Sequence, residues 1–354
     1  MAVCKHFGAC GGCTSQDMDA AAYADAKREA VVGALARAGL GDTPVEQPIS
    51  VPPRSRRRAV FKIKSLPEGL HIGFHAARSH TIVDMHQCEI LTPDLFALVE
   101  KLRGALEPLF GVGEAAELHV TECENGFDAA FRWRRKLTPA LVATLSRALT
   151  GSGIVRLVLD GERVFETAAP VVQFGAIRAS LPPHAFLQPT RQGEALLQQK
   201  VLALTGKAKT ALDLFAGLGT FTLPLAAKMK VHAVEQDRAM LNAMIAAAKA
   251  SPGLKPVTSE VRDLFRVPLS PPELGRFDAV VLDPPRAGAE AQSRALAASK
   301  VRQIVYVSCN ADSFARDAAI LAAGSFSPGP VTPVDQFLWS SHIELVASFT
   351  RSGR

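Results

Sequence analysis

The chain has 354 residues, of which 48% are hydrophobic and 21% charged, a balance that is typical of globular proteins and excludes a largely disordered chain. The length predicts two domains, and no apolar stretch approaches the roughly 18 residues that a membrane-spanning helix needs. The net charge of +6 favours an anionic partner, and because no apolar leader segment opens the chain we expect a cytoplasmic protein.

Three cysteines stand close together near the amino terminus. Cys4, Cys10 and Cys13 lie in "CKHFGACGGC". Six cysteines in a chain without a secretion signal favour metal or catalytic use over disulfides, because the cytosol keeps thiols reduced. Three neighbouring thiols predict a metal site, but a closed site usually has four ligands. The spacing alone leaves the fourth ligand open.

The first half of the chain predicts one helix followed by a sheet. Residues 17–40 repeat alanine and long charged side chains with helical spacing and end at two glycines, which indicates a helix. From about 45 to 180, short β-branched or aromatic runs are separated by Gly and Pro, with one helical stretch from about 93 to 110. We therefore expect a mainly antiparallel β domain over residues 1–180.

The second half predicts an α/β fold. Apolar runs alternate with helical sequence in the order "TALDLF", "KVHAVE", "PVTSEV", "FDAVVLD" and "RQIVYVS". Such runs are typical of a parallel sheet that helices cover on both faces. The last run, "HIELVASFT", follows the preceding strand candidate after only a loop, so we expect an antiparallel final pair. The second domain is expected over residues 181–354.

A glycine loop follows the first strand of this second domain. In "DLFAGLGTF", Gly217 and Gly219 would let the backbone pass close to a ligand at the carboxyl end of the strand. A dinucleotide fingerprint would have a third glycine where this chain has Thr222. Glu235 ends the next strand, where an acidic residue can accept hydrogen bonds from a ribose. The loop resembles the S-adenosylmethionine loop of class I methyltransferases, and a tight turn without a ligand is the alternative.

Three further strand ends carry reactive groups. Asp283 precedes two prolines, and Cys309 ends the following strand at the same edge of the sheet. A thiolate is a nucleophile, and we expect the pKa of this thiol to be lowered at the mouth of a cleft. His342 and Glu344 alternate on the last strand and should face one side, where a desolvated carboxylate can act as a general base. A structural thiol and a solvated glutamate are the alternatives.

The motifs together resemble the RNA uracil-C5 methyltransferase family, which makes 5-methyluridine in ribosomal and transfer RNA. Eight of them occur in the family's order: C-x5-C-G-G-C, "RSRRRAVFKIK", "QCEIL", "FLQP", "DLFAGLGTF", "VLDPPRAG", "IVYVSCN" and "HIE". The resemblance implies a class I S-adenosylmethionine-dependent methyltransferase fold, with a mostly parallel seven-stranded sheet and an antiparallel last strand. Many relatives carry an additional amino-terminal β-barrel, which we expect this chain to lack.

The resemblance also implies roles for single residues. Cys309 would add to carbon-6 of uracil so that carbon-5 takes the methyl group, and Glu344 would remove the carbon-5 proton so that the thiolate can leave. The positions that would line the cofactor pocket are Gln188, Phe215, Thr220, Glu235, Asp263 and Asp283. The chain departs from the family pattern at Thr190, Ala216 and Ala311, where Asn, Cys and Pro are frequent.

The same resemblance supplies the missing cysteine. Cys88, in "MHQCEIL", matches the distant ligand of a 4Fe-4S cluster that the three amino-terminal cysteines complete. Four sulfur ligands suit iron-sulfur or zinc, and the family favours the cluster. Its expected role is to tie the amino terminus to the β domain. Cys123 matches no motif and is interpreted as a packed core thiol.

Two basic segments predict contacts with RNA. Residues 54–64 carry six cations and no acid, and "FRWRRK" at 131–136 interleaves cations with Phe131 and Trp133, whose rings we expect to stack on unpaired bases. The implied substrate is 23S ribosomal RNA, with transfer RNA as the alternative, and no obligate protein partner is expected. A non-catalytic metal-bearing RNA-binding protein, or an amino-group methyltransferase that does not need Cys309, would be a different function.

Overall fold

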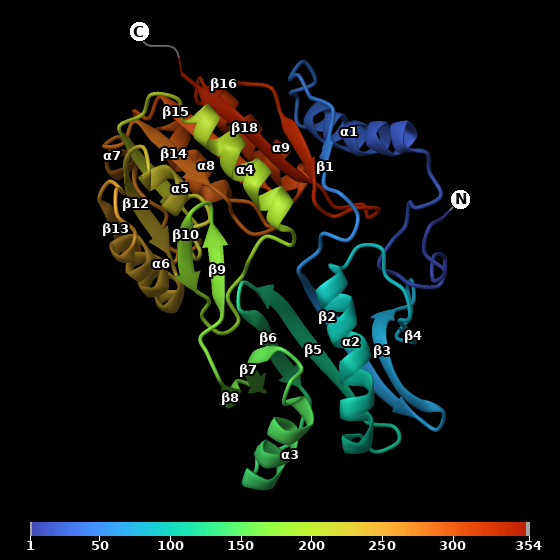
Figure 1. Ribbon diagram of the computed structural model, residues 1–354. Helices are drawn as coiled ribbons and strands as arrows, with labels where there is room; N and C mark the ends of the chain where they lie inside the picture. Colours follow the sequence, from blue (N-terminus) through green and yellow to red (C-terminus); the bar gives the residue numbers. More distant parts are fainter. Residues whose placement is uncertain (1, 352–354) are drawn as a thin grey trace.

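The computed structural model describes residues 2–351, which form a large sheet lobe and a smaller β lobe beside it (Figure 1). The strands of the large sheet run in the order β1-β17-β18-β15-β14-β11-β12-β13, with β16 paired to β18. Their bounds are β1 (Ile49–Ser50), β11 (Thr210–Leu214), β12 (Lys230–Glu235), β13 (Val257–Val261), β14 (Ala279–Leu282), β15 (Gln303–Ser308), β16 (Ser327–Pro328), β17 (Thr332–Asp335) and β18 (Glu344–Thr350).

Strands β11 to β15 are mutually parallel, and β18 is antiparallel to both β15 and β17. The seven-stranded, mostly parallel sheet with an antiparallel last strand is therefore confirmed. Two short strands extend it beyond the prediction: β1, from the amino-terminal half of the chain, pairs in parallel with β17, and β16 pairs with β18. The central strands are apolar on both faces because helices cover both sides.

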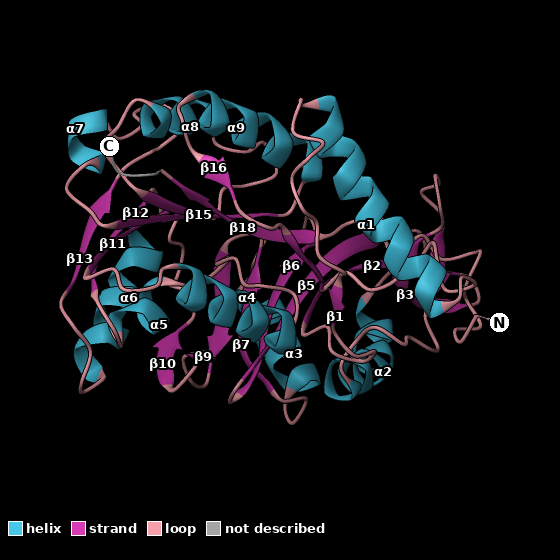
Figure 2. Cartoon of the chain, turned by 90° about the horizontal axis from the view of Figure 1, so that it is seen from above, coloured by secondary structure: helices cyan, strands magenta, loops and turns pink. Residues whose placement is uncertain are grey.

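Two layers of helices enclose this sheet. Figure 2 shows α1, α7, α8 and α9 on one face and α4, α5 and α6 on the other. The bounds are α1 (Ala20–Arg37), α4 (Arg191–Leu204), α5 (Thr222–Ala226), α6 (Arg238–Ala250), α7 (Pro271–Leu274), α8 (Glu290–Ala297) and α9 (Ala311–Ala323). The helix expected over 17–40 is α1, and Asp19 caps it by accepting the N–H of Ala22 at 2.9 Å. Its apolar side packs into the same core as α9.

The smaller lobe is a seven-stranded sheet in the order β4-β3-β2-β5-β6-β7-β8. All neighbours are antiparallel except the β6–β7 pair. Its elements are β2 (Arg58–Leu66), β3 (Gly69–His75), β4 (Ile82–Asp84), α2 (Pro93–Leu106), a 3₁₀ turn (Glu107–Leu109), β5 (Ala115–Cys123), β6 (Gly126–Arg132), α3 (Pro139–Leu149), β7 (Ile154–Leu159) and β8 (Glu162–Glu166). Helix α2 was predicted and α3 was missed, although Thr138 before Pro139 is a helix-start signal.

A separate hairpin joins the two lobes. Strands β9 (Val171–Phe174) and β10 (Ile177–Ser180) pair only with each other, and their apolar side chains pack against α6. The hairpin belongs to the first half of the chain, which was expected to end at residue 180, but it packs against a helix of the second half. Among residues 2–351, none of the helices combines the length and the apolar character that crossing a membrane requires.

Candidate functional site

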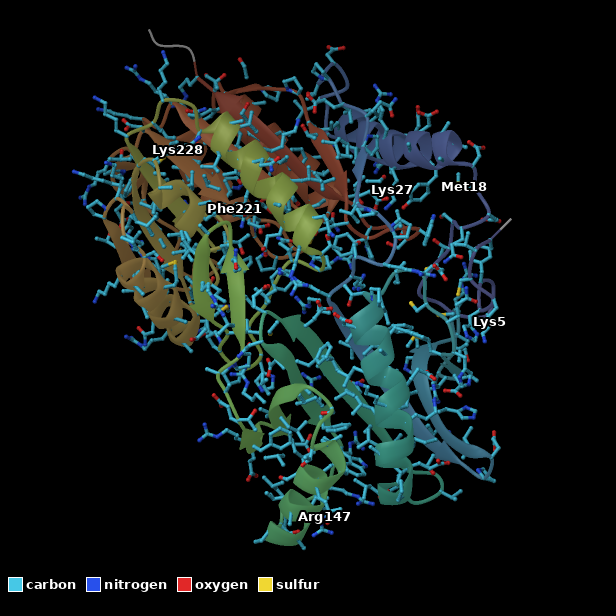
Figure 3. The ribbon with its side chains drawn as sticks, in the orientation of Figure 1. Lys5, Met18, Lys27, Arg147, Phe221 and Lys228 are labelled. Atoms are coloured by element: carbon cyan, nitrogen blue, oxygen red, sulfur yellow. The ribbon has the colours of Figure 1, made fainter. Side chains whose placement is uncertain are left out.

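A cleft of about 840 Å³ opens at the carboxyl ends of β11, β12, β14 and β15, where the large sheet faces the smaller lobe. Its size is that of a small-molecule site, and its place is where open α/β sheets bind ligands. Figure 3 labels Phe221, one of its lining residues, at the start of α5. The predicted site residues that line it are Gln188, Phe215, Thr220, Glu235, Asp283, Cys309 and Glu344.

The glycine loop forms one wall of the cleft with a left-handed backbone. Gly217 and Gly219 have φ values of 55° and 95°, and a Cβ at Gly219 would lie 2.6 Å from Met244. Phe215 adopts φ 62°, which costs a non-glycine residue about 1 kcal/mol or more. Glu235 fixes the loop, because its carboxylate accepts the N–H of Gly217 at 3.1 Å and two N–H groups of its own turn.

A second aromatic ring, which was not predicted from the sequence, stands beside Phe215. Phe265 lies 5.4 Å away between ring centroids, is half exposed and lines the cleft. Asp263 holds the turn that carries it by accepting the N–H groups of Phe265 and Arg266 at 3.0 and 3.2 Å. Asp263 itself is not among the residues that line the cleft. The sequence did contain a signal for this ring, since Phe265 stands two positions after Asp263, just beyond the end of strand β13.

Three carboxyl groups lie together behind this wall. Asp213 is buried, accepts the hydroxyl of Thr222 at 2.5 Å, and has its pKa raised to about 7 by desolvation. Desolvation, together with the charge of Asp213, raises the pKa of Asp283 to about 7. Glu344 is 2% exposed, and desolvation and Asp283 raise its pKa well above the ordinary value. The raised pKa expected for Glu344 is confirmed.

Cys309 follows β15 directly and is partly exposed in the cleft. The expectation of a lowered thiol pKa is wrong. Desolvation and the charges of Glu344 and Asp283 raise the pKa of Cys309 to about 11, against a smaller opposite effect of Arg286. The sequence pattern grouped Cys309 with Asp283 and Glu344, but it did not indicate that desolvation and these two charges would outweigh the effect of Arg286. Ionising this thiol requires a positive charge or a proton acceptor brought into the cleft.

The last strand begins two residues later than predicted. Strand β18 starts at Glu344, so His342 lies in the preceding loop rather than on the strand. Both residues nevertheless line the cleft, with His342 exposed and Glu344 buried. The two residues face the same cleft, as expected, but the course of the loop brings them together and not the alternation of side chains along a strand.

Two departures from the family pattern serve helix starts. Thr190 caps α4, and its hydroxyl oxygen accepts the N–H of Gly193 at 2.9 Å. Ala311 is the first residue of α9, which Asn310 caps by accepting the N–H groups of the second and third helical residues at 3.0 Å. Neither position contributes to the lining of the cleft.

The predicted base-stacking aromatics are wrong. Trp133 is 3% exposed and stacks on Phe110 with 4.1 Å between ring centroids, and Phe131 is buried in the same core. Phe131 points to the inner face of β6, and Trp133, which follows the end of that strand, packs into the same core. A different aromatic is available: Phe186 is 59% exposed, lines the cleft, and has the guanidinium of Arg58 4.7 Å above its ring.

The basic segment 54–64 is divided between structure and surface. Arg57 is buried and pairs with Glu194 of α4 at 2.7 Å, and Arg54 pairs with Glu89 at 2.9 Å. Arg56 lines the cleft. Only part of the predicted charge is therefore free for an anionic partner.

The four predicted metal ligands surround one small pocket. Cys4, Cys10, Cys13 and Cys88 line it together with apolar side chains from β3 and β4. Burial raises the pKa of Cys10 and Cys13, and raises that of Cys88 to about 11 although two backbone N–H groups face its sulfur. Four thiols around one pocket are the kind of donor set that soft metals bind, and binding would require their deprotonation.

Two further observations concern cysteine. Within residues 2–351, no group of three or more His, Cys, Asp or Glu side chains is spaced to hold a metal ion. The four thiols therefore share a pocket without closing on one point. Cys123 is buried in the core beside the β9–β10 hairpin, so its interpretation as a packed thiol is confirmed.

The chain is similar to RNA methyltransferases over nearly its whole length. The family described as tRNA (Uracil-5-)-methyltransferase matches residues 151–351. An uncharacterized RNA methyltransferase of Brucella suis is 42% identical, over 98% of this chain and 84% of its own. The 23S rRNA (uracil(1939)-C(5))-methyltransferase RlmD of Chromohalobacter salexigens is 32% identical, over 98% of this chain and 76% of its own.

A solved structure shares the fold. The tRNA (uracil-54, C5)-methyltransferase of Pyrococcus abyssi, in complex with S-adenosyl-L-homocysteine, superposes with a TM-score of 0.75 at 21% identity, covering 96% of this chain and 86% of that one. The class I methyltransferase fold with an amino-terminal antiparallel sheet is thereby established. The chain belongs to the RNA uracil-C5 methyltransferase family and is an S-adenosylmethionine-dependent enzyme.

Proposed function

We propose that the enzyme methylates carbon-5 of a uridine in 23S ribosomal RNA, with Cys309 as the nucleophile and Glu344 as the base. The observation that carries this proposal is that the thiol and the buried carboxyl face one cleft, close enough for each to influence the other's charge, beside the glycine loop. Residues lining that loop and the cleft, namely Gln188, Phe215, Thr220, Glu235 and Asp283, would hold S-adenosylmethionine, which supplies the methyl group. Asp263 would contribute through the turn that presents Phe265.

The reaction divides between the two side chains. Once the thiol proton of Cys309 has passed to an acceptor in the cleft, such as water, the thiolate sulfur would form a bond to carbon-6. The electron pair of the ring's double bond would then form the bond from carbon-5 to the methyl group, while the donor sulfur keeps the electrons of the bond that breaks. The carboxylate of Glu344 then takes the carbon-5 proton. The electrons of that C–H bond restore the double bond, and the C–S bond breaks to release the thiolate.

Substitution of the two residues tests these roles. We expect Cys309→Ala to abolish methylation while S-adenosylmethionine binding persists, and Glu344→Gln to accumulate a covalent protein–RNA adduct that is visible on a denaturing gel. Cys123→Ala, which removes a buried thiol outside the cleft, is the matched control. Full activity of a folded Cys309→Ala enzyme would refute the proposal.

The RNA target rests on the relatives. One relative is named for a uracil of 23S ribosomal RNA, whereas the family description and the solved structure name transfer RNA. Nucleoside mass spectrometry of both RNAs, from cells with and without the gene, decides between them. We expect 5-methyluridine to disappear from 23S ribosomal RNA only, and its loss from transfer RNA alone would select the alternative.

We further propose a division of labour within the chain and a 4Fe-4S cluster as the metal centre. Residues 1–180 would recognise RNA and residues 181–354 would perform the transfer. Four thiols that line one pocket support a metal centre with sulfur ligands, which suits an iron-sulfur cluster or zinc, and the family resemblance favours the cluster. We expect anaerobically purified enzyme to absorb broadly at about 400 nm. Cys88→Ser should lose this band and Cys123→Ser should keep it, whereas bound zinc without the band would refute the cluster.

A further inference from the structure

Two side-chain amides connect the carboxyl groups of the cleft. Gln336 follows β17 and is 2% exposed. Its Nε2 donates to Oε2 of Glu344 at 3.1 Å and to Oε1 of Gln188 at 2.6 Å. Nε2 of Gln188 in turn donates to Oδ2 of Asp283 at 3.3 Å. The amide of Gln336 is therefore the direct hydrogen-bond partner of the carboxyl that we propose as the base.

The structure holds this amide in place from two sides. A Cβ at Gly193 would lie only 2.5 Å from Oε1 and 2.7 Å from the Cβ of Gln336, so α4 leaves no space for movement in that direction. The preceding residue, Asp335, is fixed by Tyr23 at 2.6 Å and by Lys27 at 2.9 Å. A side chain confined in this way loses little further entropy when it orients a neighbour.

The donor side of the amide faces the base. An N–H donor stabilises the ionised form of a carboxyl group, and within residues 2–351 no donor reaches Oε1 of Gln336. The acceptors around Nε2 therefore set the orientation of the amide. This single contact opposes desolvation and the charge of Asp283, which both disfavour the ionised form of Glu344.

We propose that Gln336 is a positioning residue that aims Glu344 and keeps it in its proton-accepting form. The inference rests on the proposed role of Glu344. Other titratable or charged groups line the cleft with Glu344 or lie on the elements packed against β18. Those of the cleft are Arg56, Glu235, Arg262, Asp283, Arg286, Cys309 and His342. Those of the packed elements are Arg191, Glu194 and Lys200 on α4, Asp335 on β17 and Tyr306 on β15, with Arg57 and Lys27 as the ion-pair partners of Glu194 and Asp335. In the described part of the chain, the side chain of Glu344 accepts its hydrogen bond from Gln336, and no cation donates to it.

The test is a single-turnover reaction of Gln336→Met, which keeps the volume but removes the donor. The substrate is ribosomal and transfer RNA from cells lacking the gene, labelled with tritium at carbon-5, with excess S-adenosylmethionine. Methyl transfer reports the steps before proton removal, and tritium release reports the action of Glu344. We expect methyl transfer at the wild-type rate and tritium release about tenfold slower at pH 7. The rate of tritium release should recover toward pH 9, because the midpoint of its pH profile moves to higher pH when the donor to Glu344 is lost.

The matched control is Gln292→Met, since Gln292 is equally buried but bonds only to the backbone of Leu269. We expect it to leave the pH profile of tritium release unchanged. An unchanged profile in folded Gln336→Met, or equal losses of methyl transfer and tritium release, would overturn the inference. Gln336→Glu is the second variant, and wild-type tritium release at pH 7 in that variant would also overturn it. If wild-type enzyme transfers no methyl group through Cys309, the proposed function itself fails.

Discussion

Single carboxyl groups set the electrostatics of the cleft. Asp213 and Glu344 are withdrawn from water, and Asp283 lies close enough to both for each charge to disfavour the next. Such a cluster is unfavourable for stability at neutral pH, because ionising a desolvated carboxyl group costs free energy. Perturbed groups of this kind are typical of catalytic sites, where a raised pKa makes a carboxylate a useful base.

The stability of the enzyme should consequently depend on pH through Asp213. Its folded pKa of about 7 lies above the ordinary value of 3.8, so its stabilising contribution is complete below about pH 4 and is lost as pH rises through about 7. Asparagine keeps an acceptor for the hydroxyl of Thr222 but cannot ionise. We expect the free energy of unfolding of Asp213→Asn, relative to that of the wild type, to be higher at pH 8 than at pH 5 by roughly 2–4 kcal/mol. Denaturant titrations at the two pH values measure this, and parallel pH dependences of the two proteins would contradict it.

At the scale of elements, the amino-terminal helix braces the loop that leads to Glu344. The ammonium of Lys27 on α1 donates to Asp335 at 2.9 Å and to the carbonyl of His342. Tyr23 donates to Asp335 and accepts the N–H of Trp339 at 2.7 Å. Lys27 lies on the side of α1 that faces the sheet (Figure 3). The loop between β17 and β18 is thus held by a helix that begins some 300 residues earlier in the chain.

Removing the cation from this brace should be costly. Lys27→Met leaves the buried carboxylate of Asp335 without its ion-pair partner, which typically costs about 3 kcal/mol or more. We expect a loss of that size in the free energy of unfolding, and a smaller loss in the double variant with Asp335→Asn, because the uncompensated charge is then gone. Lys228→Met, at an exposed position of the large lobe (Figure 3), is the control and should be neutral. Equal stability of Lys27→Met and Lys228→Met would rule out the brace.

At the scale of the whole molecule, the two lobes meet around the cleft, and residues of both line it. The buried Arg57–Glu194 pair joins β2's amino-terminal side to α4, and Thr14 donates its N–H to the carbonyl of Trp339 at 2.7 Å. The second contact connects the cysteine-bearing segment with the loop between β17 and β18. The pocket formed by the four cysteines is thus linked to the cleft through the structure. This link does not require the cysteines to take part in the reaction.

Exposed cations of the smaller lobe should bind phosphates. Arg132 is 69% exposed, and Lys64 is exposed on β2 of the same sheet. We expect Arg132→Ala and Lys64→Ala each to weaken RNA binding and to reduce the slope of log K against log salt by about 1, since one phosphate contact fewer releases one counterion fewer. Lys228→Ala on the large lobe is the control. Filter binding at several salt concentrations measures the slopes, and three identical slopes would place the RNA elsewhere.

The sequence by itself determined the order of the elements and the edge at which the chemistry gathers. Apolar runs with turn signals identify β11 to β15, and the carboxyl ends of parallel strands must meet at one edge, so the linear order of residues is enough to group Cys309, Asp283 and Glu235. The periodicity can be recognised in the amino-acid sequence, and the rule about strand ends applies to any parallel sheet, so neither inference needs a three-dimensional structure.

Only the tertiary structure decided what each side chain meets. It placed Phe131 and Trp133 in a core, raised the pKa of Cys309 instead of lowering it, and brought Gln336 against Glu344. It also brought the amino-terminal α1 and β1 onto the large sheet. Burial and electrostatic neighbours arise from contacts between residues far apart in sequence, and no local pattern encodes the distance between two such groups or the water excluded from between them.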